Sequence, residues 1–258
     1  MDLSLIGDFA QRYKNLSQRA RVLTEPWAEE NLFCCVCESP RLTRLKHNTP
    51  GFDFSCPSCE SRYQLKSQRK KFGSTVVGSA YSIIEKAMAG DQSPNLLLLH
   101  YDPESLQVRN VIFIPSFTFV MSVIERRKPL SPTARRKGWT GYKILLHKIP
   151  SDVQIPLVEN GKPVPAAKVR DEYERLRPIR AMKPAQRGWA LDVLQVVRSL
   201  RCTEFNLSDV YGAEPELEVL HPNNGHVRDK IRQQLQVLRD TGFLKFLGRG
   251  RYRVSDSP

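Results

Sequence analysis

Residues 52–66 read FDFSCPSCESRYQLK, two short alternating segments joined by a turn that carries two cysteines. Alternation of apolar and polar side chains is typical of strands with one buried face. If FDF and YQLK pair as a hairpin, Asp53, Gln64 and Lys66 lie on one face of it. The two cysteines then lie at the hairpin tip, where a bound metal would fix the register of the strands.

A second cysteine pair precedes the first, with 18 residues between them, so the chain contains two CxxC turns. Each turn directs two sulfurs toward one point, and two such turns can close a tetrahedron around Zn²⁺. We predict a zinc ribbon over residues 34–59, with a disulfide pair or free core cysteines as the alternative. The predicted zinc ligands are Cys34, Cys37, Cys56 and Cys59. Cys35 is expected to be a bystander and Cys202 a core residue.

The chain has 258 residues and a formal net charge of +13, with 40 Lys and Arg against 27 Asp and Glu. An excess this large favours a polyanionic partner, although a solvated basic surface gives the same count. No apolar run reaches the ~18 residues that a membrane span needs, and residues 1–10 lack the basic and apolar segments of a signal peptide. We therefore expect a cytoplasmic protein, in which cysteines bind metal more often than they form disulfides.

The rest of the first 150 residues predicts a mixed α/β unit. Helical spacing of apolar residues indicates helices, and short apolar runs between turn residues indicate buried strands. The expected helices are 8–23 and 78–89, and the expected strands are 63–66, 96–101, 111–115 and 142–149. Five prolines between residues 156 and 187 indicate a linker that contains one short helix at 166–176.

Residues 188–258 follow the order helix, strand, helix, helix, hairpin, which predicts a winged-helix domain. The last helix carries an apolar stripe and begins after Asn223 or Asn224, either of which can cap it. The stripe consists of Val227, Ile231, Leu235 and Leu238.

Polar side chains on the other sides of this helix suit the major groove of DNA. Arginine pairs with guanine and glutamine with adenine there, and a basic hairpin tip can reach phosphates. The predicted DNA-binding residues are Arg228, Arg232, Gln233, Gln236, Arg249 and Arg251. A solvated amphipathic helix is the commoner use of such residues, but the winged order and the adjacent basic hairpin favour DNA.

The hairpin at residues 52–66 also resembles the PD-(D/E)xK nuclease core, in which an acid on one strand and an acid-x-Lys on the next gather Mg²⁺ and a water. The resemblance implies that Asp53 binds Mg²⁺ and that Lys66 neutralises charge or positions the water. Gln64 stands where the motif has Glu or Asp. Its carbonyl oxygen can bind Mg²⁺, but less well than a carboxylate. The alternative is an ordinary hairpin on which Asp53 and Lys66 are simply exposed and have no catalytic role.

Long strings along the chain resemble the DpnI-like, or Dam-replacing, restriction endonucleases. The shared strings are residues 17–25, the two CxxC turns, Asp53 with 65–67, 132–136 with Gly138 and Trp139, 187–189, 230–235 with 238–240, and 248–250 with Tyr252 and Arg253. The resemblance implies a Mg²⁺-dependent nuclease domain with a structural zinc at residues 1–180 and a winged-helix domain at 181–258. It also implies type II cleavage of double-stranded DNA at GATC sites that carry N6-methyladenine, with Glu in the family at the position of Gln64.

An N6-methyl group adds apolar surface, which a closely fitting aromatic wall can sense. Trp139 follows the basic run Arg135-Arg136-Lys137. The resemblance makes Trp139 the expected methyl contact, with Arg135 and Arg136 on phosphates. Plain core packing is the alternative for Trp139, and it is the stronger interpretation for Trp189.

Three functions fit these patterns: a methyl-directed GATC endonuclease, a non-cutting reader of methylated DNA that lost catalysis through Gln64, and a zinc-ribbon transcription regulator. Asp53, Lys66 and the basic turn 66–71 favour the first over the third, because a regulator has no need of this hairpin. Only activity separates the first from the second. The expected partner is double-stranded DNA with methylated GATC, bound by a monomer in the bacterial cytoplasm without an obligatory protein partner or membrane contact.

Overall fold

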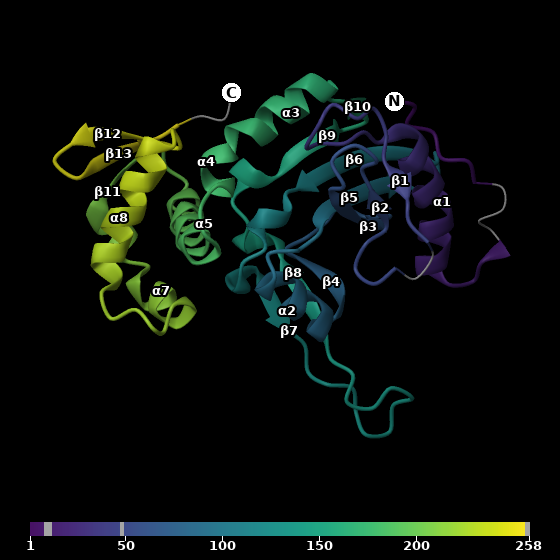
Figure 1. Ribbon diagram of the computed structural model, residues 1–258, viewed down its shortest axis with the longest axis horizontal. Helices are drawn as coiled ribbons and strands as arrows, with labels where there is room; N and C mark the ends of the chain where they lie inside the picture. The colour runs from purple at the N-terminus through teal and green to yellow at the C-terminus, as the bar shows by residue number, and fades with distance from the viewer. Residues whose placement is uncertain (8–11, 47–48, 256–258) are drawn as a thin grey trace.

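The computed structural model describes residues 1–7, 12–46 and 49–255, and its elements fall into two regions (Figure 1). Elements up to α4 build a mixed α/β region around a seven-stranded sheet, whereas α5 to β13 build a smaller, mainly helical region. In Figure 1 the purple α1 and the yellow β12 and β13 lie at opposite ends of the molecule. Within the described ranges, no helix is long and apolar enough to cross a bilayer.

The seven-stranded sheet has the order β1-β2-β3-β5-β6-β9-β10, in which β3 and β5 run parallel and the other neighbours run antiparallel. The central strand β5 buries Leu96–Leu99 almost completely, as expected for a strand covered on both faces. The predicted strands 63–66, 96–101 and 111–115 are confirmed as β3, β5 and β6. The bounds are β1 (Thr43–Arg44), β2 (Phe54–Ser55), β3 (Arg62–Gln68), β5 (Asn95–Asp102), β6 (Gln107–Ile114), β9 (Ile155–Glu159) and β10 (Lys162–Pro163).

Strands β2 and β3 form the predicted hairpin. Phe54 pairs with Tyr63 and Ser55 with Arg62. The N–H of Cys56 donates to the carbonyl of Ser61 at 2.9 Å and closes the turn. The CPSC segment is therefore the hairpin tip, as the alternation of residues 52–66 predicted.

A second sheet of three antiparallel strands, in the order β4-β8-β7, lies beside α2. The predicted helix at 78–89 begins late, because residues up to Ala80 pair with β8 and the Tyr142 ring lies against Gly78, where a Cβ would approach it to 2.2 Å. The predicted strand 142–149 ends at Leu145 and continues as a 3₁₀ helix. The bounds are β4 (Thr75–Ala80), α2 (Tyr81–Ala89), η2 (Ser116–Thr118), η3 (Met121–Val123), β7 (Ile124–Arg126), β8 (Gly141–Leu145) and η4 (Leu146–Lys148).

Helix α1 (Leu16–Asn31) departs from the predicted helix at 8–23. It begins after Asn15, whose side-chain oxygen accepts hydrogen bonds from the first turn, an N-cap that the apolar spacing did not locate. It also continues past Pro26, because Trp27 and Ala28 beyond the proline are buried in the core. Residues 8–11 of the predicted helix lie outside the described residues.

The prediction of a linker at residues 156–187 is wrong. Strand β9 pairs with β6 inside the large sheet, and α3 (Ala166–Arg175) packs against β9. Three of the prolines occupy positions that tolerate a missing N–H: an edge strand at Pro163, and the first turns of α4 (Arg177–Arg180) and α5 (Pro184–Ser199). Pro156 lies within β9 itself, where the register with β6 is irregular. The short helix predicted at 166–176 is confirmed as α3, and η5 (Ser151–Val153) precedes β9.

The C-terminal region has the predicted buried stripe on its last helix, but three helices, not the predicted two, lie between its first strand and the hairpin. The predicted cap is wrong, because His226 is the N-cap of α8 and the Asn224 side chain accepts from the His226 N–H in the preceding turn. Cys202 is exposed rather than in the core. The bounds are β11 (Glu204–Asn206), α6 (Leu207–Tyr211), α7 (Glu214–Leu220), α8 (Val227–Asp240), β12 (Leu244–Gly248) and β13 (Arg251–Val254), with the sheet order β11-β13-β12.

Helix α5 joins the two regions. Its side chains pack into the C-terminal core and also reach η2 and η3 of the first region. Trp189 is buried on this helix and stacks on His221 at 3.7 Å, so its predicted core role is confirmed. Polar contacts across the joint pair Arg187 with Asp91, Arg198 with Asp152, and Asp192 with Ser122.

Candidate metal centre and active site

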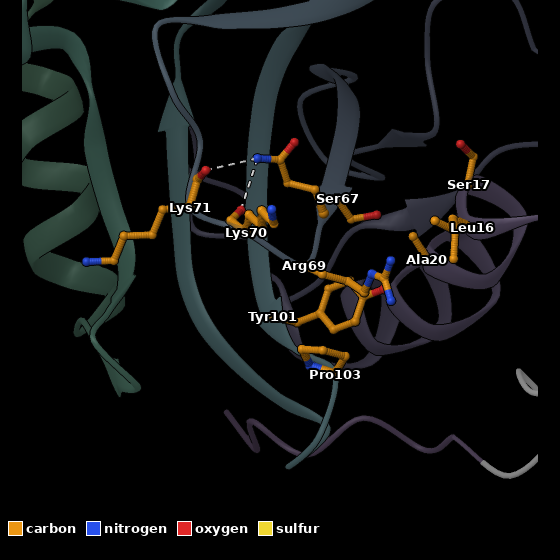
Figure 2. Close-up of a pocket in the computed structure, with 10 residues that line it drawn as sticks. Leu16, Ser17, Ala20, Ser67, Arg69, Lys70, Lys71, Tyr101 and Pro103 are labelled. Atoms are coloured by element: carbon orange, nitrogen blue, oxygen red, sulfur yellow. Dashed lines mark hydrogen bonds between the residues drawn. The ribbon is translucent and has the colours of Figure 1, made fainter.

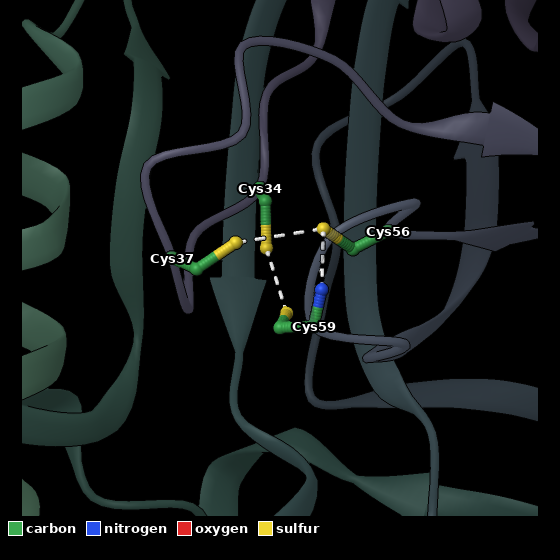
Figure 3. Close-up of side chains that lie close together, drawn as sticks. All are labelled: Cys34, Cys37, Cys56 and Cys59. Carbon is green, nitrogen blue, oxygen red and sulfur yellow. Dashed lines mark hydrogen bonds between the residues drawn. The ribbon is translucent and has the colours of Figure 1, made fainter.

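The four predicted cysteines converge on one point (Figure 3). All four sulfurs lie within 4.8 Å of one another. Cys34 Sγ is 3.6 Å from Cys59 Sγ, and Cys37 Sγ is 3.5 Å from Cys56 Sγ. A tetrahedral Zn²⁺ with Zn–S bonds of about 2.3 Å requires sulfur–sulfur edges of about 3.8 Å. The cluster therefore has the size and donor set to hold a structural metal such as zinc.

Backbone N–H groups in the cluster favour thiolates. The N–H groups of Ser58 and Cys59 lie 3.4 and 3.5 Å from Cys56 Sγ. Burial acts to raise the pKa of Cys56, but these N–H groups outweigh it and lower the pKa to about 6. The Val36 N–H also donates to Cys34 Sγ at 3.4 Å, but there burial outweighs it and raises the pKa of the Cys34 thiol. Burial likewise raises the pKa of Cys37, so among these three cysteines the thiolate, the form that binds metal, is favoured at Cys56.

Cys35 lies outside the sulfur cluster, as predicted, although it is fully buried beside it. Helix α3 supports this knuckle from the other side. Arg170 donates to the carbonyls of Cys34 and Ser39 at 3.2 and 3.3 Å, and its guanidinium lies 5.2 Å from the Phe33 ring centre. The segment that the sequence suggested was a linker thus holds the first CxxC turn in place.

Asp53 lies where β2 and β3 separate. Its backbone carbonyl accepts from Leu45 at 2.8 Å, and its Oδ2 accepts from the Leu65 N–H at 2.8 Å. The carboxylate thus accepts the hydrogen bond that a carbonyl of a neighbouring strand would otherwise accept, and this bond fixes it against β3. Continuing the register of Phe54 with Tyr63 places Asp53 opposite Gln64.

Gln64 and Lys66 alternate with Leu65 along β3 and therefore share one face of the strand. Gln64 is only 6% exposed, and its side-chain amide has no hydrogen-bond partner in the described part of the chain. Without such a partner, the amide beside the Asp53 carboxylate leaves an oxygen donor free for a ligand.

Asp53 and Lys66 act on each other electrostatically. Burial raises the pKa of Asp53, while the Leu65 N–H and the Lys66 ammonium act to lower it. Burial lowers the pKa of Lys66, and the Asp53 carboxylate opposes that change. The two predicted residues are therefore close enough to form one charged site at the end of the hairpin.

Three charged residues at this site were not predicted. Glu25 of α1 is 9% exposed. Its negative charge raises the pKa of Asp53, although less than burial does. Its carboxylate accepts from Arg21 Nε at 3.0 Å and also pairs with Arg44. Arg44 lies on β1 opposite Phe54, next to Asp53. Glu25 thus holds two arginines beside Asp53, with their guanidinium groups still partly exposed.

The sequence contained little sign of this arrangement. Arg21 and Glu25 are four residues apart, which suits a helical ion pair. The contact to Arg44, however, depends on how α1 lies against the hairpin. Residues 17–25 form one of the strings that carry the family resemblance, and that string was the available signal.

Arg135, Arg136 and Trp139 lie on an arm of residues 127–140 that projects between β7 and β8 (Figure 1). The arm contains five Lys and Arg and no Asp or Glu. Its base is closed by the Arg127 N–H, which donates to Gly141 at 2.9 Å. The arginines are exposed and Trp139 is partly buried. They lie away from Asp53 in the chain's topology and do not belong to the same cluster.

The Trp139 ring packs directly against Gly141. A Cβ added to Gly141 would lie 2.8 Å from Trp139 Cη2, closer than real side-chain contacts allow. The absence of a side chain at Gly141 therefore lets the indole pack against the backbone at the base of the arm. Trp139 is partly buried there, so it is neither a core residue nor fully exposed.

The predicted DNA-facing residues of α8 are exposed, namely Arg228, Arg232, Gln233 and Gln236. Gly248, Arg249 and Gly250 all have positive φ and form the hairpin turn, so Arg249 lies at the exposed tip, as expected.

Several of these arginines have acidic partners within the same region. Arg228 donates to Glu214 at 2.7 Å, and Arg251 donates to Glu204 at 2.9 Å. Arg232 pairs with Asp229 and also donates to the Tyr211 hydroxyl at 3.0 Å. These contacts orient the guanidinium groups on the surface before any ligand is bound.

The chain thus combines a mixed α/β region, whose four close cysteines could hold a metal, with a mainly helical C-terminal region that exposes several arginines. Residues 1–182 match the family model described as the Dam-replacing family (DpnI), and residues 185–254 match the one described as the Dam-replacing HTH domain. These matches cover nearly the whole chain, so the protein belongs to the DpnI, or Dam-replacing, family. Membership implies a methyl-dependent restriction endonuclease with a DNA-binding helix-turn-helix domain.

Proposed function

We propose that this protein is a type II restriction endonuclease that cleaves double-stranded DNA at GATC sites carrying N6-methyladenine. Residues 1–180 form the nuclease domain with a PD-(D/E)xK core and a structural zinc, and residues 181–258 form a winged-helix domain. The protein acts as a monomer on its DNA. The proposal rests on family membership and on the site at the end of the β2–β3 hairpin.

One observation carries the catalytic assignment. The Asp53 carboxylate is fixed against β3 by the Leu65 N–H, beside the unpaired amide of buried Gln64 and the ammonium of Lys66. Carboxylate and amide oxygens are the donors that Mg²⁺ prefers, and it keeps several waters when bound by one or two such groups. The residues present therefore fit a Mg²⁺ site.

Mg²⁺ bound by Asp53 and Gln64 would acidify a water and neutralise charge on the phosphate. Lys66 holds a positive charge within reach of the same oxygens, and its burial strengthens that charge's effect on a developing oxyanion. Arg21 and Arg44, held by Glu25, add positive charge beside Asp53. We assign these two arginines to the DNA phosphates on either side of the cleaved bond.

Two further elements read the site. Arg228, Arg232, Gln233 and Gln236 on α8 face the major groove, with Arg249 and Arg251 on phosphates. The arm places Arg135 and Arg136 on the backbone and Trp139 against the methyl group. Because the arm and α8 belong to different regions, each recognises the methylated sequence with its own surface.

The direct test is cleavage of methylated and unmethylated GATC plasmid with Mg²⁺. We expect cutting of the methylated plasmid alone. Asp53→Ala is expected to abolish cutting while binding in Ca²⁺ changes little, because the carboxylate serves the metal rather than the DNA. Full activity of Asp53→Ala would refute the site assignment.

A second candidate function is favoured by Gln64 itself. A neutral amide binds hard cations less well than the family's glutamate, so the protein could be a reader that binds methylated GATC without cutting. In that case the wild type binds methylated duplex but leaves it intact with either Mg²⁺ or Mn²⁺.

A further inference from the structure

A cleft of about 710 Å³ lies between the first turns of α1 and the end of β3 (Figure 2). Helix α1 contributes one wall with Leu16, Ser17 and Ala20. Residues 67–71 form the other wall, and Tyr101 and Pro103 lie at the base. None of the residues assigned above to metal, catalysis or DNA recognition lines this cleft.

The cleft is strongly basic. Arg69, Lys70 and Lys71 line it, no acidic residue does, and none of the three cations has a carboxylate partner in the described ranges. By contrast, many arginines elsewhere are paired, as Arg21 is with Glu25. The turn that carries the cations is fixed by Gln68 Nε2, which donates to the carbonyls of Lys70 and Lys71 at 3.0 and 3.2 Å (Figure 2).

Tyr101 provides a second, independent sign of a ligand. Its side chain lines the cleft, and its hydroxyl makes no hydrogen bond to the residues that the structure describes, so it can donate to a ligand in the cleft. Burial raises the pKa of Tyr101 while the guanidinium groups of Arg69 and Arg19 act to lower it, so positive charge lies close to this hydroxyl.

The chemistry of the lining selects the ligand class. Unpaired cations and a free hydroxyl donor suit a phosphate, and the lack of carboxylates excludes a cation. Leu16, Ala20 and the Tyr101 ring provide apolar contact for a sugar attached to that phosphate. A backbone nucleotide of DNA combines these two features.

The position of the cleft links it to the proposed cleavage site. Ser67 directly follows Lys66 on β3, so the two residues are only about 3.3 Å apart along the strand. Because successive side chains of a strand alternate, Ser67 points to the opposite side of β3 from Lys66. However, β2 pairs only with Arg62 and Tyr63, so no strand covers the outer edge of β3 beyond them. The Thr24 hydroxyl donates to Ser67 Oγ at 2.9 Å and holds α1 against this edge.

We infer that this cleft binds a backbone phosphate of the DNA strand next to the phosphate that is cleaved. Arg69 and Lys70 neutralise it, whereas the Lys71 ammonium points away from the other lining side chains (Figure 2) and adds only to the local positive charge. The Tyr101 hydroxyl donates to one of the phosphate oxygens. This inference rests on the proposed function, since it takes DNA as the ligand. It adds an interaction that orients the strand over the edge of β3.

The test uses the full chain and a methylated GATC duplex, with Ca²⁺ in place of Mg²⁺ so that binding is measured without cleavage. Arg69→Gln/Lys70→Gln/Lys71→Gln is compared with Lys162→Gln/Lys168→Gln/Arg177→Gln, which removes the same charge from exposed positions on β10, α3 and α4. We expect the slope of log Kd against log salt to fall by about 0.9 for each phosphate that the cleft variant no longer neutralises. The control variant is expected to keep the wild-type slope. Tyr101→Phe should weaken binding roughly 3- to 10-fold.

Equal slopes for the cleft and control variants would overturn the inference, as would full affinity of a folded Tyr101→Phe protein. The cleavage proposal fails separately. A wild type that binds with the full slope but leaves DNA intact in Mg²⁺ contradicts cleavage, and a reduced slope in the cleft variant still supports the cleft.

Discussion

The Tyr63 hydroxyl lies 3.1 Å from Cys34 Sγ and accepts a hydrogen bond from the buried Cys35 N–H at 3.2 Å. Tyr63 precedes Gln64 on β3, so one strand contacts the cysteine cluster through one residue and carries the proposed magnesium ligand at the next. The cluster thereby fixes β3 from the opposite face, in addition to holding the hairpin tip.

Tyr63→Phe should weaken both the fold and the metal centre. It leaves the Cys35 N–H buried without an acceptor, which costs about 1–3 kcal/mol. Urea unfolding should show that loss, and zinc should transfer to a chelator faster than from wild type. Tyr252→Phe removes a hydroxyl from a buried tyrosine of the C-terminal region and serves as the control. Unchanged zinc release in Tyr63→Phe would show that the hydroxyl does not support the cluster.

We expect one zinc per chain by elemental analysis. Cys56→Ser should lose the zinc and much of the stability, because metal binding at such a cluster contributes directly to folding. Cys202→Ser, at an exposed cysteine outside the cluster, should keep both. Folded wild-type protein purified without zinc would contradict the assignment.

Gln64→Ala should reduce cleavage by at least roughly 10-fold, the loss seen when even an outer partner of a metal ligand is removed. Gln64→Glu should raise activity or metal affinity, since it supplies a charged oxygen at nearly the same size. Initial cleavage rates across a Mg²⁺ titration measure both effects. The gain should disappear in an Asp53→Ala background. If wild type is inert with Mg²⁺ and Mn²⁺ while Gln64→Glu cuts, the protein is a reader that has lost catalysis.

Glu25→Gln should lower the cleavage rate more than it lowers affinity for DNA in Ca²⁺. The neutral amide no longer anchors Arg21 and Arg44 as an ion pair, so their positive charge is less well placed beside Asp53. Glu29→Gln, one turn further along α1, is the matched control, because among the described residues Glu29 accepts a hydrogen bond from the Arg44 backbone N–H, at 3.3 Å, and has no ion pair. Equal losses of cleavage rate in the two variants would contradict the positioning role of Glu25.

Gly141→Ala should displace the Trp139 ring, since the new Cβ would lie 2.8 Å from it. We expect a loss of about 1–3 kcal/mol in stability from overpacking and a smaller ratio of methylated to unmethylated cleavage. Gly225→Ala has no heavy atom within 4 Å of the new Cβ and is the control. Preference for methylated DNA that survives both Gly141→Ala and Trp139→Ala would exclude Trp139 as the methyl contact.

Local patterns predicted the elements that short-range physics controls. The alternation around Asp53 and Lys66 predicted the hairpin, and the CxxC spacing predicted the sulfur cluster. The stripe of α8 predicted its buried face. Each of these depends on residues a few positions apart, so the sequence contains the full signal.

The features that the sequence did not predict depend on long-range packing. The number of prolines in residues 156–187 suggests a linker. In the structure, however, Pro163 lies on an edge strand, and Pro178 and Pro184 lie in the first turns of helices. Whether they do so depends on β9 entering the sheet beside β6, which no local pattern specifies. The pairing of Glu25 with Arg44 and the cleft over Tyr101 likewise arise only when α1 lies against β3.

The arm of residues 127–140 has a consequence for how this protein could change over time. Backbone hydrogen bonds from Arg127 to Gly141, from Leu130 to Trp139 and from Gly138 to Leu130 join its two sides, and its residues are largely exposed. Insertions or substitutions there would leave the hairpin with Asp53 and Lys66 intact. The surface of the arm could therefore diverge while the proposed hydrolytic site is inherited unchanged.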